Sequence, residues 1–187
     1  MKHLIISLAT AFASFAGLIQ GEERHVIEAR RYLQEEATVF QSLGFKIFSW
    51  GGSFINQINA LMLSVELPVT VDFSNSRTVF TICLFDLISS VNENKQAYPY
   101  YKNYPMTVEN IEFRMITKDF DTLSSHKDPV VSLIFNVGDK IIYCHRDETT
   151  KSLVPFFRES FEKNAHPDIV KSLPHLWDLQ QNQLIKQ

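Results

Sequence analysis

Cys144 and His145 are adjacent in the chain, and a thiol beside an imidazole is a combination that nucleophilic catalysis uses. Both residues fall in the run IIYCHR, residues 141–146, whose composition predicts a β-strand. Successive side chains of a strand point to opposite faces, so this thiol and this imidazole cannot form the hydrogen bond that would activate the sulfur. The pair therefore does not predict a cysteine nucleophile.

The chain has two cysteines, and their chemistry depends on whether they meet in the fold. Cys83 lies on the apolar stripe of a predicted helix, and Cys144 lies in a predicted strand. In an exported protein two such residues can form a disulfide. They can equally remain buried thiols that pack as small hydrophobic side chains. The sequence leaves both alternatives open for Cys83 and Cys144.

The histidines beyond the first 21 residues do not have the spacing of a metal site. They are His25, His126, His145, His166 and His175. These residues form neither the i, i+4 pair of a zinc-binding helix nor a set with two closely spaced cysteines. The glycine pair in SWGGSF, residues 49–54, lacks the strand–loop–helix setting of a phosphate-binding loop and is interpreted as a turn. The sequence thus predicts no metal and no cofactor.

Two carboxylates, Glu109 and Glu112, lie next to a segment rich in aromatic residues. A pair of carboxyl groups is what glycoside hydrolysis needs, one as acid and the other as base or nucleophile. With a histidine brought near by the fold, this pair supports an alternative function, a hydrolase that acts on an envelope polymer. The sequence therefore keeps a hydrolase as its second hypothesis.

The stretch QAYPYYKNYP, residues 96–105, holds four of the six tyrosines of the chain, Tyr98, Tyr100, Tyr101 and Tyr104. Its prolines keep the backbone extended and stiff, so the rings lose little entropy when they bind a partner. These tyrosines are the candidate binding surface. In the alternative interpretation the same rings lie over the end of the core and are held there by their hydroxyl groups.

The first 21 residues have the three-part form of a secretory signal peptide. Lys2 is followed by an apolar stretch from Leu4 to Ile19, which is shorter than a helix that crosses a bilayer. Small residues allow cleavage after Ala16 or, with a poorer fit, after Gly21. We expect an exported protein, periplasmic or secreted, with no stable membrane span once the signal is removed. The alternative is an uncleaved signal that tethers the domain to a membrane.

The formal net charge of the chain is −3. The sequence has no run of lysines and arginines that would favour binding to nucleic acid or to anionic lipid. We therefore expect no nucleic-acid partner. Residues 22–178 suit a single domain, and residues 179–187 form a polar C-terminal tail.

Apolar spacing predicts three helices and five strands along the domain. The helices are expected at residues 22–43, 72–95 and 152–164, and the strands at 45–50, 58–67, 110–117, 130–137 and 141–146. Short turns join two of the strand pairs, which excludes parallel pairing within them. The pattern predicts an α+β fold with a mainly antiparallel sheet of about five strands and helices packed on one face.

The segment YKNYPMTVENIEF, residues 101–113, together with INALMLSVEL, residues 58–67, resembles an uncharacterised family of short exported proteins from chlamydia-related bacteria. In that family a similar Asn-Tyr-Pro-x-Thr segment leads into a strand. The resemblance covers roughly residues 30–145. It implies export and an α+β domain, and it supplies no catalytic residues. The favoured hypothesis is a non-enzymatic binding or envelope-interaction module whose partner is a protein or an envelope polymer.

Overall fold

The computed structural model describes residues 23–67, 73–117, 131–147 and 149–164. The predicted signal peptide, residues 1–21, and the predicted polar tail, residues 179–187, lie outside the described residues. Export therefore stays a prediction from sequence.

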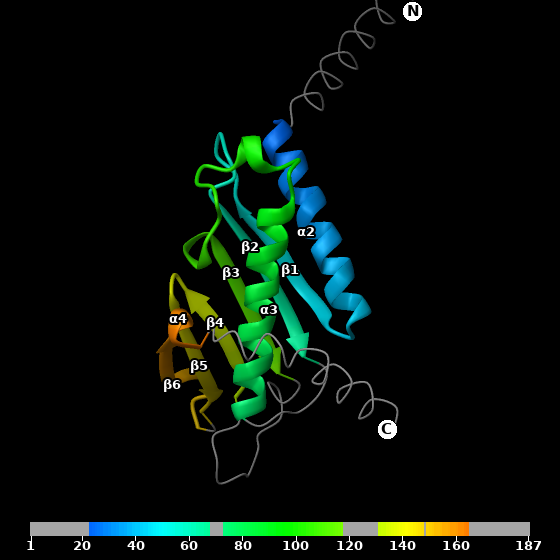
Figure 1. The fold of residues 1–187 in the computed structure, drawn as a ribbon. Helices are drawn as coiled ribbons and strands as arrows, with labels where there is room; N and C mark the ends of the chain where they lie inside the picture. Colours follow the sequence, from blue (N-terminus) through cyan, green and yellow to red (C-terminus); the bar gives the residue numbers. More distant parts are fainter. Residues whose placement is uncertain (1–22, 68–72, 118–130, 148, 165–187) are drawn as a thin grey trace, which may run out of the picture.

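Along the chain the described elements are a helix, two strands, a second helix, four strands and a short last helix (Figure 1). The elements are α2 (Arg24–Ser42), β1 (Lys46–Ser53), β2 (Ala60–Leu67), α3 (Phe73–Glu93), β3 (Ile111–Thr117), β4 (Leu133–Val137), β5 (Lys140–Arg146), β6 (Leu153–Ser160) and α4 (Phe161–Asn164). Two 3-10 turns, Tyr98–Tyr100 and Val108–Asn110, lie between α3 and β3.

The six strands form one sheet in the order in which they occur in the chain. The neighbouring pairs are antiparallel except β2 and β3, which run parallel and are connected through α3. A parallel pair needs a crossover that returns the chain to the same end of the sheet, and α3 provides it. The predicted α+β fold is confirmed, with six strands rather than five.

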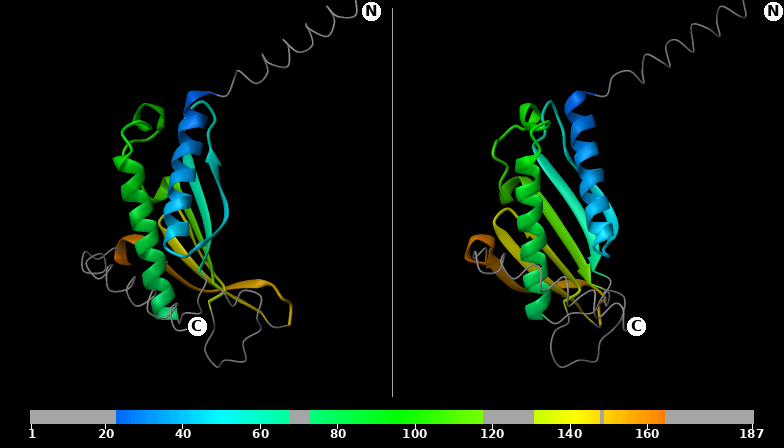
Figure 2. Two further views of the ribbon diagram at one scale, coloured as in Figure 1. Left: turned by 90° about the vertical axis from the view of Figure 1, so that its right-hand side faces the viewer. Right: turned by 45° about the vertical axis from the view of Figure 1, so that its right-hand side comes forward.

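Helices α2 and α3 cover the same face of the sheet (Figure 2). On that face the core is built from alternate residues of the central strands, as the period of two in β3 predicts. Phe113 of β3 lies at its centre, with its ring centroid 5.6 Å from Phe40 of α2 and 5.2 Å from Phe80 of α3. The apolar stripes of both helices thus meet one strand.

Helix α2 ends where its sequence predicts. Its stripe includes the buried residues Ala29, Leu33 and Phe40. Gly44 follows with a φ of 91°, a left-handed conformation that glycine adopts without steric cost.

The helix predicted at residues 152–164 is wrong over most of its length. Residues Leu153–Ser160 form strand β6, which pairs antiparallel with β5, and only Phe161–Asn164 are helical. Pro155 is tolerated because β6 is an edge strand, with one side free of ladder bonds to other described strands. Pairing with β5 decided the conformation here, and local spacing could not reveal it.

The side chains of β6 explain how an edge strand is held to the domain. Glu159 accepts a hydrogen bond from the Tyr143 hydroxyl at 2.5 Å and pairs through both carboxylate oxygens with Arg77 of α3. Phe73, at the start of α3, packs against rings of both β5 and β6, with centroids 5.1 Å from Tyr143 and 5.3 Å from Phe157. Strand β6 is therefore fixed by α3 as well as by β5.

The glycine pair also differs from its interpretation as a turn. Gly51 and Gly52 lie inside β1, opposite Met62 and Leu61 of β2, and neither has a positive φ. The hairpin turns later, over residues 54–59. There Asn56 has a φ of 61°.

Candidate functional site

The four candidate tyrosines, here called the tyrosine cap (Tyr98, Tyr100, Tyr101 and Tyr104), lie beyond the C-terminal end of α3. Tyr101 is buried, Tyr98 and Tyr100 are half-buried, and Tyr104 is 54% exposed. The structure thus brings the four residues together but leaves one ring in solvent.

Two backbone carbonyls at the end of α3 anchor the cap. Tyr101 donates its hydroxyl hydrogen to the carbonyl of Val91 at 3.0 Å, and Tyr98 donates to the carbonyl of Asn92. The last carbonyls of a helix have no partner inside it, so these hydroxyls satisfy groups that would otherwise need water. Desolvation raises the pKa of Tyr101, with Tyr98 and Tyr104 adding to the effect.

The backbone around the cap is held from two further sides. Ile58 donates to the carbonyl of Tyr100 at 2.8 Å, and Lys102 donates to the carbonyl of Ile58 at 3.1 Å, which joins the cap to the start of β2. The Asn92 side-chain amide donates to the Met106 carbonyl at 2.7 Å and accepts from its N–H at 2.8 Å. No local pattern identifies Asn92 in the sequence, because its partner lies 14 residues away in the chain.

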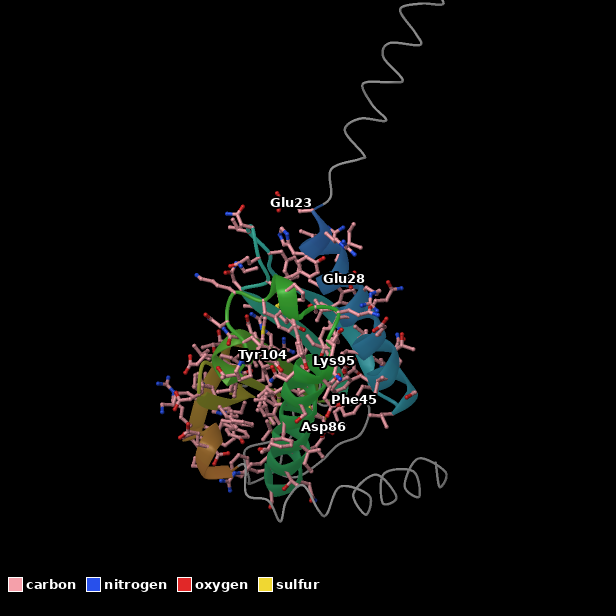
Figure 3. All side chains as sticks on the ribbon, turned by 45° about the horizontal axis from the view of Figure 1, so that its top comes forward. Glu23, Glu28, Phe45, Asp86, Lys95 and Tyr104 are labelled. Carbon is pink, nitrogen blue, oxygen red and sulfur yellow. The ribbon has the colours of Figure 1, made fainter. Side chains whose placement is uncertain are left out.

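Tyr104 rests on the anchored rings. Its ring centroid is 4.3 Å from Tyr98, and its plane is within 13° of Tyr101 at a centroid distance of 6.4 Å. Hydrogen bonding to the Tyr98 side chain raises the pKa of Tyr104, and the nearby Lys95 acts in the opposite direction. Figure 3 labels Tyr104 and Lys95, which lie near the C-terminal end of α3. The exposed ring of Tyr104 thus packs on Tyr98 and Tyr101, with the ammonium group of Lys95 nearby.

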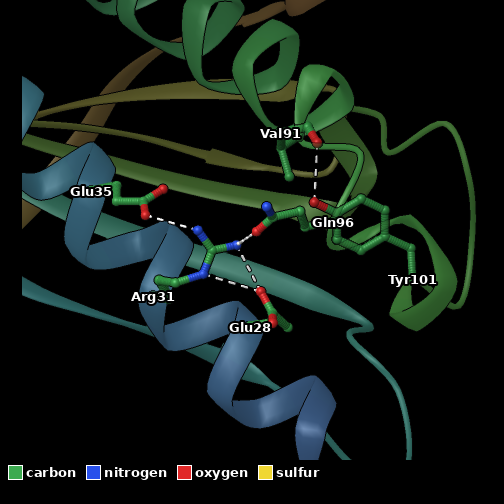
Figure 4. Close-up of polar contacts among 6 residues, drawn as sticks. All are labelled: Glu28, Arg31, Glu35, Val91, Gln96 and Tyr101. Carbon is green, nitrogen blue, oxygen red and sulfur yellow. Dashed lines mark hydrogen bonds and ion pairs between the residues drawn. The ribbon is translucent and has the colours of Figure 1, made fainter.

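An ion-pair network connects the cap to α2 (Figure 4). Arg31 donates to Glu28 at 2.7 Å, to Glu35 at 2.9 Å and to the side-chain carbonyl of Gln96 at 2.6 Å. Because Gln96 lies in the segment that begins the cap, this arginine fixes the cap against the neighbouring helix. The pKa of Arg31 is raised, chiefly by its hydrogen bond to Glu28.

The two carboxylates of the hydrolase hypothesis have separate surroundings. Glu112 forms an exposed ion pair with Arg114, two residues along the same strand. Glu109 lies in the 3-10 turn before β3 and packs against Gly138, where a Cβ would lie 2.6 Å from its Oε2. Glu112 is thus paired with an arginine, and Glu109 packs on the turn that contains Gly138.

Cys83 and Cys144 are free thiols, 2% and 3% exposed, so the disulfide alternative does not hold. Tyr143 faces α3, since it contacts Phe73, and the next residue of β5 must face the other side of the sheet. Cys83 lies in the core on the helix side. The sheet thus separates the two sulfurs. Burial raises the pKa of both thiols, which disfavours the reactive thiolate.

Two histidines fall among the described residues. His25 is buried at the start of α2, with its Nε2 2.5 Å from the carbonyl oxygen of Phe54. The ring of His145 contacts that of Phe156 at a centroid distance of 5.6 Å, and its Nδ1 has no hydrogen-bond partner within the described part of the chain. Across those residues no three His, Cys, Asp or Glu side chains are grouped to hold a metal ion.

Comparison of the chain with protein-family models, with curated proteins and with solved structures gives no match. The resemblance to exported proteins of chlamydia-related bacteria therefore stays a prediction. Of the helices in the described ranges, none has the length and apolar character needed to span a bilayer.

Proposed function

We propose that this chain is a non-enzymatic binding module of an exported protein, and that it holds a protein or an envelope polymer against Tyr104. The observation that carries the proposal is a half-exposed aromatic ring whose position is already fixed by Tyr98 and Tyr101. A ligand that stacks on this ring does not have to order it first. The entropy cost of binding is correspondingly small.

The residues around Tyr104 favour a ligand with a flat apolar face. Lys102, Asn103, Tyr104 and Pro105 are consecutive exposed residues, and Lys95 and Pro99 are exposed nearby. A tyrosine ring with a proline beside it can stack on a sugar ring or on the side chains of an extended peptide. The lysines add hydrogen-bond donors at the rim. These features support recognition and contain no group activated for bond cleavage.

The proposal is tested by comparing Tyr104→Ala with Tyr101→Ala. Two defined probes are titrated into the isotopically labelled protein, a peptidoglycan digest and a set of extended proline-containing peptides, while amide chemical shifts are recorded. We expect one probe to shift the signals of residues 95–105. Tyr104→Ala should abolish these shifts at an unchanged melting temperature, whereas Tyr101→Ala should lower the melting temperature because it opens the core.

Two control variants separate ring chemistry from general exposure. Tyr104→Phe keeps the stacking face and should retain binding. Ile55→Ala removes a side chain that is 77% exposed and lies in the turn after β1, and it should change neither readout. Binding that survives Tyr104→Ala, or the absence of shifts at residues 95–105 with both probes, would reject Tyr104 as the site.

A further inference from the structure

The outer side of β1 is a strand edge that no described strand covers. Residues 49–53 pair in regular register with β2, beyond an irregularity between Ile47 and Ser49. This stretch, SWGGS, contains neither a charge nor a proline, the two devices that most often keep strand edges from pairing. Trp50 is 39% exposed, and Phe48, which lies at that irregularity, is 60% exposed.

The two glycines of this stretch have different explanations. A Cβ on Gly52 would lie 2.7 Å from the Phe54 ring and would also clash with the carbonyl oxygen of Ala60, so packing inside the molecule requires glycine there. A Cβ on Gly51 would meet only the Met62 methyl group at 3.8 Å, an ordinary contact. Gly51 has no positive φ. A glycine inside a strand that neither packing nor backbone conformation demands is typical of a place where another backbone approaches closely.

We propose that β1 pairs antiparallel with β1 of a second copy of this chain, with the two Gly51 residues facing each other on the two-fold axis. This register places Ser49 opposite Ser53 of the other copy and Trp50 opposite Gly52. Because the ring of Phe54 lies over Gly52, each Trp50 gains an aromatic neighbour from the other copy. The two sheets join into one continuous sheet.

A second copy fits this edge because the edge is complementary to itself. A two-fold axis requires each surface to match its own copy, with residue i against j and j against i. The one charged residue of β1 is Lys46, which pairs with Glu66 at 2.9 Å. In the dimer the two copies of Lys46 lie at opposite ends of the interface. No like charges face each other near the axis. Trp50 is the one large residue of SWGGS and lies opposite Gly52 of the other copy, so the two tryptophans do not collide.

The pairing is tested first by sedimentation of the purified protein at about 100 μM, where a dimer of micromolar affinity is largely formed. We expect a mass twice that of the monomer. Gly51→Glu places two carboxylates face to face on the axis and should weaken the dimer at least tenfold, with the far-UV spectrum unchanged. Val154→Glu changes an exposed residue of the other edge strand, β6, and should leave the dimer intact.

The register is tested by disulfide trapping, which also decides the case in which Gly51→Glu fails to fold. Gly51→Cys should cross-link to its own copy under mild oxidation, since a residue on the axis faces itself. An equal mixture of Ser49→Cys and Ser53→Cys should cross-link, whereas either variant alone should not. The native cysteines are buried and do not interfere. A monomer under all these conditions, or pairing of this edge with peptides only, overturns the proposal.

Discussion

The two edge strands of the sheet, β1 and β6, have the same length but are protected in different ways. Strand β6 carries Pro155, an irregular register opposite Tyr143 and Cys144, and an ion pair from Glu159 to Arg77 of α3. Strand β1 carries two glycines, an exposed tryptophan, and one lysine that pairs with the neighbouring strand. Anchoring the side chains of an edge strand to a helix closes that edge, and β1 has no such anchor among the described contacts.

The largest effect is expected when the ion pair that holds β6 to α3 is removed. Arg77→Ala leaves the carboxylate of Glu159, whose side chain is 9% exposed, without its cation. We expect the free energy of unfolding to fall by about 2 kcal/mol, less than for a fully buried pair, because the Arg77 side chain is 40% exposed. Urea unfolding measures it. The double variant Arg77→Ala/Glu159→Gln removes the stranded charge and should recover part of the loss, so a double variant less stable than the single one would contradict the argument.

The second test concerns the glycines of β1. Gly52→Ala should lower the free energy of unfolding by about 2 kcal/mol, because the new methyl group collides with Phe54 and the backbone of Ala60. Gly51→Ala should change it by less than about 0.5 kcal/mol, since the space beside it is open. Thermal unfolding at low protein concentration, where chains do not associate, compares the two. Equal effects would show that Gly51 is also required inside the molecule.

The third test uses Cys144 as a reporter of β6. Cys144 pairs with Pro155 of β6, and it is 3% exposed. Arg77→Ala should raise the rate of native-state thiol labelling at Cys144 about tenfold, equivalent to about 1.4 kcal/mol in the opening equilibrium. Cys83, which is buried on α3, should not gain as much. Mass spectrometry of labelled peptides separates the two sites, and equal gains would mean that the whole domain opens rather than its edge.

The smallest effect is expected at Glu36 of α2, a carboxylate that forms no ion pair with the described residues. Burial raises its pKa above the ordinary value of 4.5, opposed by a hydrogen bond from Ser90 of α3. A raised pKa means that the folded state holds the proton more tightly, so this contribution to stability is complete below the unfolded pKa. It is lost as the pH rises through the folded pKa.

Glu36→Gln should therefore flatten the pH dependence of the unfolding free energy above pH 4.5, because glutamine does not titrate. The variant should be at least as stable as the parent at neutral pH. Urea unfolding between acidic and neutral pH measures the slope, with Glu93→Gln, an exposed carboxylate at the end of α3, as the control. An unchanged slope would show that Glu36 is well solvated in the folded state.

The helices and strands that are marked by a local pattern of apolar residues could be predicted from the sequence. The stripe of α2, the C-terminal Gly44 and the alternation of β3 are all local patterns, and the structure has each of them. Strand β6 was missed because Phe156, Phe157 and Phe161 also fit a helical face, and because its hydrogen bonds go to a strand outside its own segment. The glycine turn was misplaced for the same reason, since crowding by Phe54 and Ala60 appears only in three dimensions.

For the candidate site, the sequence predicted which segment is involved but not how its tyrosine side chains are arranged. The density of tyrosines at residues 96–105 identified the segment, but the partners of the hydroxyl groups lie at the end of α3 and could not be assigned from spacing. Which ring stays in solvent depends on those anchors. The Arg77–Glu159–Tyr143 cluster had no sequence signal, because its members lie up to 82 residues apart.

The parallel pairing of β2 with β3 has a consequence for how the chain reaches this fold. On one side of that pair lie α2 and the β1–β2 hairpin, and on the other lie β3 to β6, each strand paired with the next one in sequence. Both halves can form through contacts between nearby residues, whereas their junction requires the chain to close a loop that contains all of α3. Loop closure of this kind slows folding more than it lowers stability. The docking of two preformed halves, rather than the formation of either, should set the folding rate of this domain.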